Sequence, residues 1–181
     1  EIRAILEEFR SFFENENTEK VGQNIKTSIK ILNKYSIQLK GKLFDTMLAH
    51  YLINPDMRHD LNVLSETYLN YKPLTIETFI GKKGKNQLSI REIDLEKQTV
   101  YIVQNTDLTF QLKSFFEKEL ETYKLSTLFN DIEIPLLKVL AAMELEGIKL
   151  DSEFLNSLSK NLVEDIQKLE DAIYKEANLE F

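Results

Sequence analysis

Residues 93–119 carry the pattern that most constrains this fold, because it predicts one long helix. Within this segment Tyr101, Asn105, Leu108 and Leu112 follow one another at intervals of three or four residues, so they share one face of the helix. A phenol and a carboxamide therefore lie one turn apart on an otherwise apolar stripe. This stripe is either part of a functional site or a core face that tolerates two polar side chains.

The composition limits which functions are open to the chain. Its 181 residues allow one full domain, or one domain plus part of another. No apolar run is long enough to span a bilayer and no signal peptide stands at the start, so a cytoplasmic setting is expected. The absence of cysteine excludes disulfides and thiolate metal sites.

The net charge and the histidine content further limit which functions are open to the chain. The formal net charge of −7 argues against non-specific nucleic-acid binding by this chain alone, because phosphate contacts need concentrated Lys and Arg. Two histidines leave little scope for a histidine-based metal or nucleophile–base site. His50 lies among apolar residues, and we expect it to be structural.

Helical spacing dominates the rest of the chain, so we expect an α/β fold that is predominantly helical. Further helices are predicted around residues 2–13, 25–32, 46–52, 61–69, 134–145 and 155–173. A strand or turn is predicted at residues 20–24, and a strand at residues 38–44 with Gly41 as a possible bulge.

Local signals predict where several of these helices begin and end. Asn24 and Asp45 precede helical segments and are typical N-cap residues, as is Asp151 or Ser152 before the last helix. Gly147 is expected to end the helix before it.

The last helix carries an apolar seam whose members step by three or four residues. The seam consists of Leu155, Leu158, Leu162, Ile166, Leu169 and Ile173. Such a seam needs a partner helix, and packing within the chain is favoured over an intermolecular coiled coil.

Five sequence blocks, in order and in register, resemble the bacterial DNA polymerase I family (family A). The blocks are KVGQN at 20–24, FDTML at 44–48, YLINPDMRH at 51–59, GKNQL at 84–88 and AAMELEGI at 141–148. One block alone would be weak evidence, whereas five in register are specific.

The resemblance implies a fragment of a longer polymerase. Residues 1–130 would be a ribonuclease H-like 3′→5′ exonuclease domain that lacks its first strands, and residues 131–181 the first helices of the polymerase domain, leading into the thumb. The fingers, palm and most of the thumb would lie beyond Phe181, so this chain would not add nucleotides. DNA would be its partner within the full-length enzyme, with weak or no binding by the fragment. No cofactor is expected for the fragment, and Mg²⁺ for the parent polymerase.

The family hydrolyses DNA with two divalent metals held by clustered acidic residues, and hard cations need such anionic oxygens. Its Asp-x-Glu motif would precede Glu1. Its Gly-Gln-Asn-x-x-Tyr-Asp motif corresponds to residues 22–28, where Ser28 replaces the aspartate. Its Tyr-x-x-x-Asp motif corresponds to Tyr101 and Asn105, so the second aspartate is an amide.

Both acidic positions that the chain could contribute are therefore neutral, and we expect no metal site and no intact catalytic residue. Tyr101 remains where the family uses a hydroxyl to orient water. Asp107 is no substitute for the missing carboxylate, because two residues beyond Asn105 it points to a different side of the helix.

Three further residues are candidates for DNA contact by the same resemblance. They are Gln23, Asn24 and Arg58. For Asn24, capping a helix is the favoured role. For Arg58, a solvated position in a loop is an equally good explanation.

Two alternatives to an inactive exonuclease domain stay open. One is an active two-metal proofreading nuclease that relies on carboxylates outside this chain. The other is a non-enzymatic binding module that uses the last helix or the Arg58 region.

The missing strands also lead to a structural expectation. The remaining strands near Val21 and Leu43 would expose a sheet edge. Residues 1–45 are then expected to be poorly ordered or covered by another copy, with self-association through the edge or the last helix.

Overall fold

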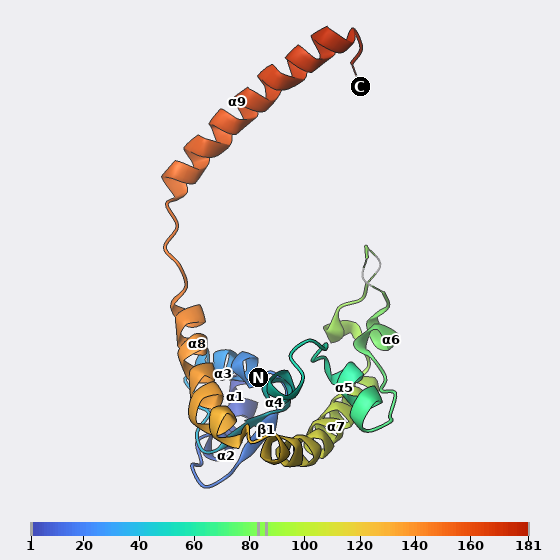
Figure 1. The fold of residues 1–181 in the computed structure, drawn as a ribbon, viewed down its shortest axis with the longest axis vertical. Helices are drawn as coiled ribbons and strands as arrows, with labels where there is room; N and C mark the ends of the chain where they lie inside the picture. The colour runs from blue at the N-terminus through green and yellow to red at the C-terminus, as the bar shows by residue number, and fades with distance from the viewer. Residues whose placement is uncertain (1, 83, 86, 181) are drawn as a thin grey trace. The chain divides into compact units, whose positions relative to one another are not determined.

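The long helix predicted from residues 93–119 is present as α7, which spans Leu95–Thr122. The computed structural model describes residues 2–82, 84–85 and 87–180. These residues divide into a first unit that runs to Leu145 and a second that starts at Glu146. Helices dominate both units (Figure 1), as predicted. Among the described residues, no helix combines the length and the apolar character needed to cross a bilayer.

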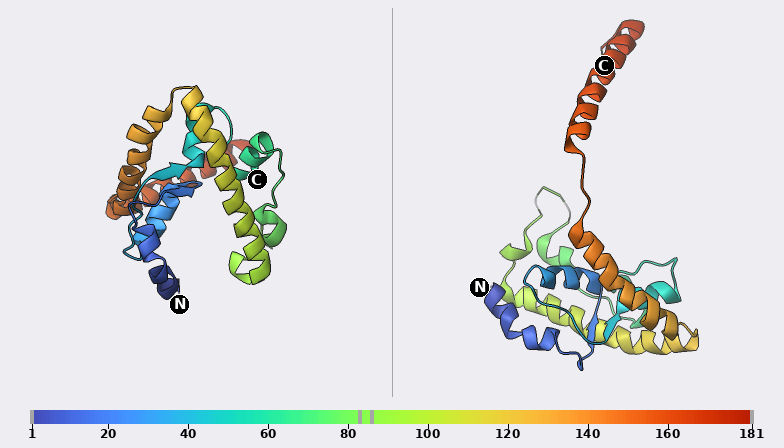
Figure 2. Two further views of the ribbon diagram at one scale, coloured as in Figure 1. Left: turned by 90° about the horizontal axis from the view of Figure 1, so that it is seen from below. Right: turned by 90° about the vertical axis from the view of Figure 1, so that its left-hand side faces the viewer.

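Helix α7 organises the first unit. It packs against α4 (Thr46–Ile53), α5 (Leu61–Tyr68) and strand β1 (Lys20–Gly22), and Figure 2 shows it passing beside the strands. Its buried residues are Leu108, Thr109, Leu112, Phe116 and Leu120. The stripe identified from the sequence is therefore a core face in its second half, where Leu108 and Leu112 are buried, while Tyr101 and Asn105 are only partly buried.

The sheet among the described residues has two strands. β1 pairs in parallel with β2 (Leu43–Asp45), so that Val21 lies opposite Phe44, and helix α3 (Ile25–Asn33) connects the two. A helical crossover is the usual way to join parallel neighbours. The outer side of each strand has no described strand beside it. All three residues of β2 are nevertheless buried, so an exposed sheet edge stays a prediction.

The strand predicted at 38–44 is present only from Leu43 to Asp45, so its predicted start and the bulge at Gly41 are wrong. The segment turns at Gly41 with a φ of +84°, and a Cβ there would lie 2.7 Å from the carbonyl oxygen of Thr18. Carbonyl oxygens of Asn15 and Glu16 are nearly as close, at 2.9 Å each. Pairing starts only after this turn because the chain first has to pass close to the backbone of residues 15–18.

The expectation that residues 1–45 are poorly ordered is wrong for the described part of this segment. Helices α1 (Ile2–Glu8) and α2 (Arg10–Phe13) precede β1 and α3. The single helix predicted at 2–13 is thus two helices, interrupted at Phe9. Whether another copy covers this segment stays a prediction.

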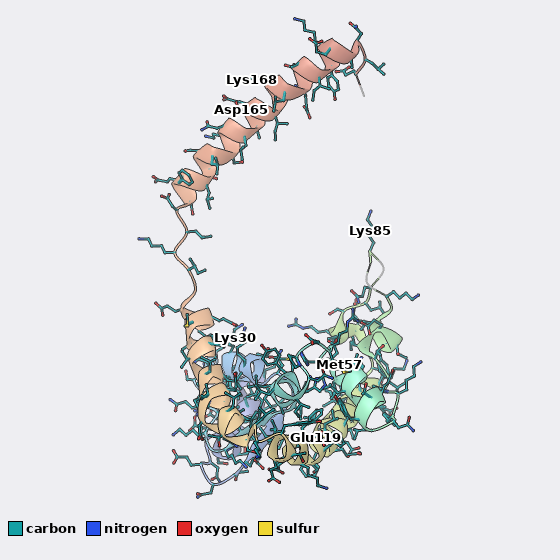
Figure 3. All side chains as sticks on the ribbon, viewed as in Figure 1. Lys30, Met57, Lys85, Glu119, Asp165 and Lys168 are labelled. Atoms are coloured by element: carbon teal, nitrogen blue, oxygen red, sulfur yellow. The ribbon has the colours of Figure 1, made fainter. Side chains whose placement is uncertain are left out.

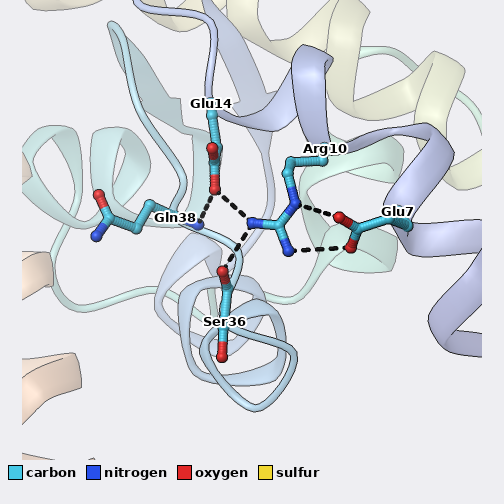
Figure 4. Close-up of polar contacts among 5 residues, drawn as sticks. All are labelled: Glu7, Arg10, Glu14, Ser36 and Gln38. Carbon is cyan, nitrogen blue, oxygen red and sulfur yellow. Dashed lines mark hydrogen bonds and ion pairs between the residues drawn. The ribbon is translucent and has the colours of Figure 1, made fainter.

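Arg10 ties this N-terminal part to the turn that follows α3 (Figure 4). Its guanidinium donates to Glu7 at 2.7 Å, to Glu14 at 2.9 Å and to the carbonyl oxygen of Ser36 at 2.8 Å. The Glu14 carboxylate in turn accepts from the backbone N–H of Gln38 at 3.2 Å. The bonds to Ser36 and from Gln38 cross more than twenty residues of sequence, which no local pattern could reveal.

Asp45 caps the N-terminus of α4, as predicted, and its side chain also accepts the first hydrogen bonds of α3. Its Oδ1 accepts from the amides of Met47 at 3.0 Å and Leu48 at 3.3 Å, which caps α4. The same oxygen accepts from the amide of Asn24 at 3.1 Å, and Oδ2 accepts from that of Ile25 at 2.6 Å. Burial raises the pKa of the Asp45 carboxyl, and the four amide hydrogen bonds act in the opposite direction.

Asn24 does not cap α3 with its own side chain, so that prediction is wrong. It stands at the N-cap position with a φ of +59° but makes no side-chain capping bond. The distant carboxylate of Asp45 takes the role that the Asn24 side chain would have had.

Helix α8 (Ile134–Glu146) closes the first unit and follows a π-helix at Leu128–Glu133. Its Leu137 packs with Ile25 and Leu43, so α8 covers α3 and β2. Glu144 adds ion pairs to Lys26 at 2.7 Å and to Lys30 at 2.5 Å, where α3 meets α8 (Figure 3).

The second unit contains α9 (Ser152–Ala177), which begins with a capping bond from the amide of Phe154 to Asp151 at 2.9 Å. The start predicted at Asp151 is therefore confirmed. Gly147 has a φ of +78° and follows the end of α8, also as predicted. None of the described residues of α9 is buried, and a partner helix for its apolar seam stays a prediction.

Candidate functional site

Tyr101 and Asn105 line one hollow of about 530 Å³, which lies between α7, β1 and the start of α5. Gln23 and Leu61 reach the same hollow from the other elements. Further lining residues are Val21, Gly22, Ile102, Thr106, Thr109 and Phe110. The helical periodicity of α7 could have indicated Thr109 as well, because it follows Asn105 by one turn.

The side-chain oxygen of Asn105 is the least satisfied polar atom of this hollow. Oδ1 is buried and has no hydrogen-bond partner among the described protein atoms. The backbone oxygen of Asn105 accepts from the hydroxyl of Thr109 at 2.7 Å. Asn105 therefore places a neutral, buried acceptor beside the hollow.

Tyr101 is held at the rim by an aromatic contact. Its ring packs edge-on against Phe79 of α6 (Ile76–Ile80), with centroids 6.0 Å apart. It also lines a smaller, mostly apolar pocket of about 170 Å³, to which Ile76 and Ile93 contribute. One phenol therefore separates a partly polar hollow from an apolar one.

Gln23 lines the hollow, but its amide already has partners. Nε2 donates to the carbonyl oxygen of His59 at 2.7 Å, and Oε1 accepts from the hydroxyl of Thr46. Both ends of the amide are used within the fold. Gln23 therefore joins β1, α4 and the loop before α5.

Ser28 does not share the hollow of Tyr101 and Asn105. It is exposed on α3 and lines a second hollow of about 320 Å³. The two hollows have Val21, Gly22 and Phe110 in common. The structure thus places Ser28 and Asn105 in neighbouring hollows on either side of shared lining residues.

The remaining two predicted residues lie outside both hollows. Asn24 is partly buried and donates its backbone N–H to Asp45. Arg58 is exposed in the loop between α4 and α5.

No carboxylate among the described lining residues reaches the hollow of Asn105. Asp107 is exposed and accepts from the amide of Gln111 at 2.7 Å. Glu19 lines the second hollow, where it forms ion pairs with Lys42 at 3.1 Å and Lys113 at 3.3 Å.

The donor set does not fit a divalent metal of the Mg²⁺ type. Within residues 2–82, 84–85 and 87–180, no group of three or more His, Cys, Asp or Glu is arranged to hold a metal ion. Mg²⁺ is bound through carboxylates because it gives up its hydration water reluctantly. Amide and hydroxyl oxygens bring no charge to offset that cost.

The first two thirds of the chain match a known protein family. A protein-family model described as 3′-5′ exonuclease matches residues 1–121. The chain belongs to this exonuclease family of the family A DNA polymerases. The resemblance found in the sequence is thereby confirmed.

Curated relatives extend the match beyond the exonuclease region. DNA polymerase I of Borreliella burgdorferi is 36% identical over 181 residues, which is 100% of this chain and 19% of the relative. DNA polymerase I of Pseudomonas aeruginosa is 34% identical and is matched over 98% of this chain and 20% of its own length. The chain therefore spans about a fifth of the length of these relatives.

A solved structure shares the fold. It is described as the POL domain of Pol1 from M. smegmatis in complex with DNA primer-template and dNTP. It matches 96% of this chain and 27% of its own chain with a TM-score of 0.74, at 22% sequence identity.

Proposed function

We propose that this chain is the exonuclease-like part, and the start of the polymerase part, of a family A DNA polymerase acting in replication and repair, and that its exonuclease centre is inactive. Residues 1–130 would form a truncated ribonuclease H-like domain, and residues 131–181 would lead into the thumb. The domain would then serve as a scaffold. DNA binding, Mg²⁺-dependent nucleotide addition and a bacterial cytoplasmic setting belong, in this proposal, to the full-length protein.

The neutral amide of Asn105 carries the proposal. It lies one turn after Tyr101 in the same hollow, where the family motif has an aspartate, and its buried oxygen has no described partner. Hydrolysis by two metals requires negative ligands that hold both cations against the phosphate. The described residues around Asn105 supply hydroxyls, amides and apolar groups instead.

The position of Ser28 supports the same reading. The family motif ends in an aspartate there, and the hydroxyl of Ser28 lines the neighbouring hollow. One neutral position could be offset by an upstream acid. Two neutral positions leave any upstream carboxylates without partners.

The deciding experiment uses the full-length polymerase without dNTPs, so that synthesis does not compete with hydrolysis. A 5′-labelled primer with a 3′ mismatch is incubated with Mg²⁺ or Mn²⁺, and its length is followed over time. We expect the primer to keep its length. An Asp107→Ala variant is the matched control, because Asp107 lies on the same helix but outside the hollow.

One result would overturn the proposal. It is metal-dependent shortening of the primer that disappears in Asn105→Ala and persists in Asp107→Ala. Such a pattern would show that Asn105 belongs to a working centre completed by acids elsewhere in the protein.

A further inference from the structure

His50 has a partner at each of its two ring nitrogens. It lies on α4 and is fully buried. Its Nδ1 is 2.7 Å from Nδ1 of His59, and its Nε2 is 2.9 Å from the hydroxyl of Tyr68 on α5. The three side chains form a continuous chain of hydrogen bonds from Tyr68 on α5 through His50 on α4 to His59 in the loop.

A contact between two Nδ1 atoms depends on protonation. One nitrogen must carry the hydrogen and the other must accept it. A proton added to His59 can still be accommodated, because His59 then donates to His50, which in turn donates to the Tyr68 oxygen. A second proton, on His50, would place two N–H groups and two positive charges against each other.

The contact holds a loop that reaches the candidate site. Residues 54–60 connect α4 to α5 and include Arg58, and Figure 3 labels Met57 within them. His59 is fixed by its ring to His50 and by its carbonyl oxygen to Gln23 at 2.7 Å. Gln23 lines the hollow of Asn105, so the loop and the hollow share one residue.

The described rings that pack on the pair are aromatic side chains, not charged groups. The ring of Tyr51 meets His59 edge-on at 5.6 Å, and Phe116 of α7 lies 5.5 Å from His50. Glu119 and Tyr123 near the end of α7 act on the Tyr68 hydroxyl, and burial is the first cause of the raised pKa of Tyr68. Within the described chain, neither imidazole forms a hydrogen bond to a carboxylate.

From this geometry we propose that His50 and His59 form a proton-sensitive latch, which holds residues 54–60 against α4 and Gln23 at neutral pH and releases them in acid. The proposal does not depend on whether the exonuclease centre is active. Burial, followed by the charge of His59, lowers the pKa of His50 from 6.5 to about 4, which matches a contact that excludes the proton. Opening of the loop removes the contact with His59, so His50 can then accept a proton and acid should favour the open loop below pH 6.5, by at most tenfold per pH unit for one proton.

Amide hydrogen exchange of the 181-residue chain tests the latch. Exchange rates of residues 54–60 are measured from about pH 7.5 to about 4.5 and corrected for the intrinsic pH dependence. We expect opening of this loop to rise as the pH falls below 6.5, by up to tenfold per pH unit, while amides in the buried half of α7 change far less. In His50→Gln, where this titration is removed, the pH dependence of the loop should be flat.

Two results would overturn the latch. One is a pH dependence of the loop that is unchanged in His50→Gln, and the other is loop exchange that follows the α7 amides at every pH. If His50→Gln does not fold, imidazole nitrogen NMR of the wild-type chain decides. Titration of His50 well below 6.5 supports the latch, and titration of His50 near 6.5 rejects it.

Discussion

The carboxylate of Asp45 lies 2.6 Å from the backbone nitrogen of Ile25, although Asp45 ends strand β2 and Ile25 begins helix α3. The same side chain also caps its own helix through Met47 and Leu48. One buried carboxylate therefore satisfies the first amides of both α3 and α4, at the end of the strand that joins them.

Replacement of Asp45 by alanine should lower the free energy of unfolding by about 2–4 kcal/mol, because four amides lose their acceptor. Asp45→Asn should cost less, about 1–2 kcal/mol. In this variant Oδ1 keeps its bonds, and only the backbone N–H of Ile25 would face the NH₂ group of the new asparagine instead of an acceptor. Urea denaturation measures both values. Equal losses in the two variants would contradict the separate role of Oδ2.

Gly41→Ala should destabilise the chain by about 2–4 kcal/mol, because the new Cβ meets three carbonyl oxygens and the backbone has a φ of +84°. Gly81→Ala is the matched control. Gly81 has a φ of +80° but no atom within 4 Å of the added Cβ, so it should lose only about 1 kcal/mol. Thermal unfolding compares the two, and similar shifts would show that crowding at Gly41 is relieved by movement of residues 15–18.

Stability should fall in mild acid because of His50. Burial lowers the pKa of His50 in the folded chain to about 4, whereas the unfolded chain has the ordinary value of 6.5. The unfolded state therefore binds more protons between these values, and this contribution is lost as the pH falls from 6.5 to about 4. The loss has an upper limit of about 3 kcal/mol. Urea unfolding across this range should show a shallower slope in His50→Gln, and parallel curves would contradict the assignment to His50.

Substitutions at Asn105 should separate the effect of side-chain shape on stability from the effect of a negative charge. Asn105→Leu should change the free energy of unfolding by less than about 1 kcal/mol, because the buried Oδ1 has no described partner to lose. Asn105→Asp should cost about 1–3 kcal/mol at neutral pH, since a carboxylate would be placed where the lining residues offer no positive charge. Thermal unfolding gives the order of stability. A large loss in Asn105→Leu would show that Oδ1 makes a bond in solution.

The ion pairs of Glu144 should make the end of α8 sensitive to salt. Hydrogen bonds from Lys26, then from Lys30, lower the pKa of Glu144 from 4.5 to about 2, so its contribution is present above 4.5 and is lost between these values. In Glu144→Gln we expect faster amide exchange in the last turn of α8 at low salt, and no difference at about 1 M salt. Glu146→Gln, on an exposed neighbour in the same helix, is the control. An effect of equal size at both salt concentrations would point to packing instead.

Local signals in the sequence predicted most helices correctly. The cap residues Asp45 and Asp151 stand directly before the helices that they begin, and Gly147 follows the helix that it ends. Such signals act within a few residues, so they can be read without knowledge of the fold. The polar stripe on α7 was visible for the same reason, and the hollow beside Tyr101 and Asn105 lies where it indicated.

The errors arose where distant residues decide the local structure. Asn24 looks like a cap, but the carboxylate of Asp45 already occupies that position. Residues 38–42 alternate like a strand, but the close passage at Gly41 keeps them out of the sheet. The link between Arg10 and Ser36, which places the N-terminal helices, joins residues that no periodic pattern connects.

The parallel pairing of β1 and β2 also determines how this chain can fold. Parallel neighbours cannot zip up from a tight turn, so the pair forms only when the whole of α3 has been brought between the strands. The buried carboxylate at the end of β2 receives its bonds from α3 only at that moment. Loss of Asp45 should therefore slow refolding as well as lower stability, and the rate at which the two strands meet should limit the speed at which this unit forms.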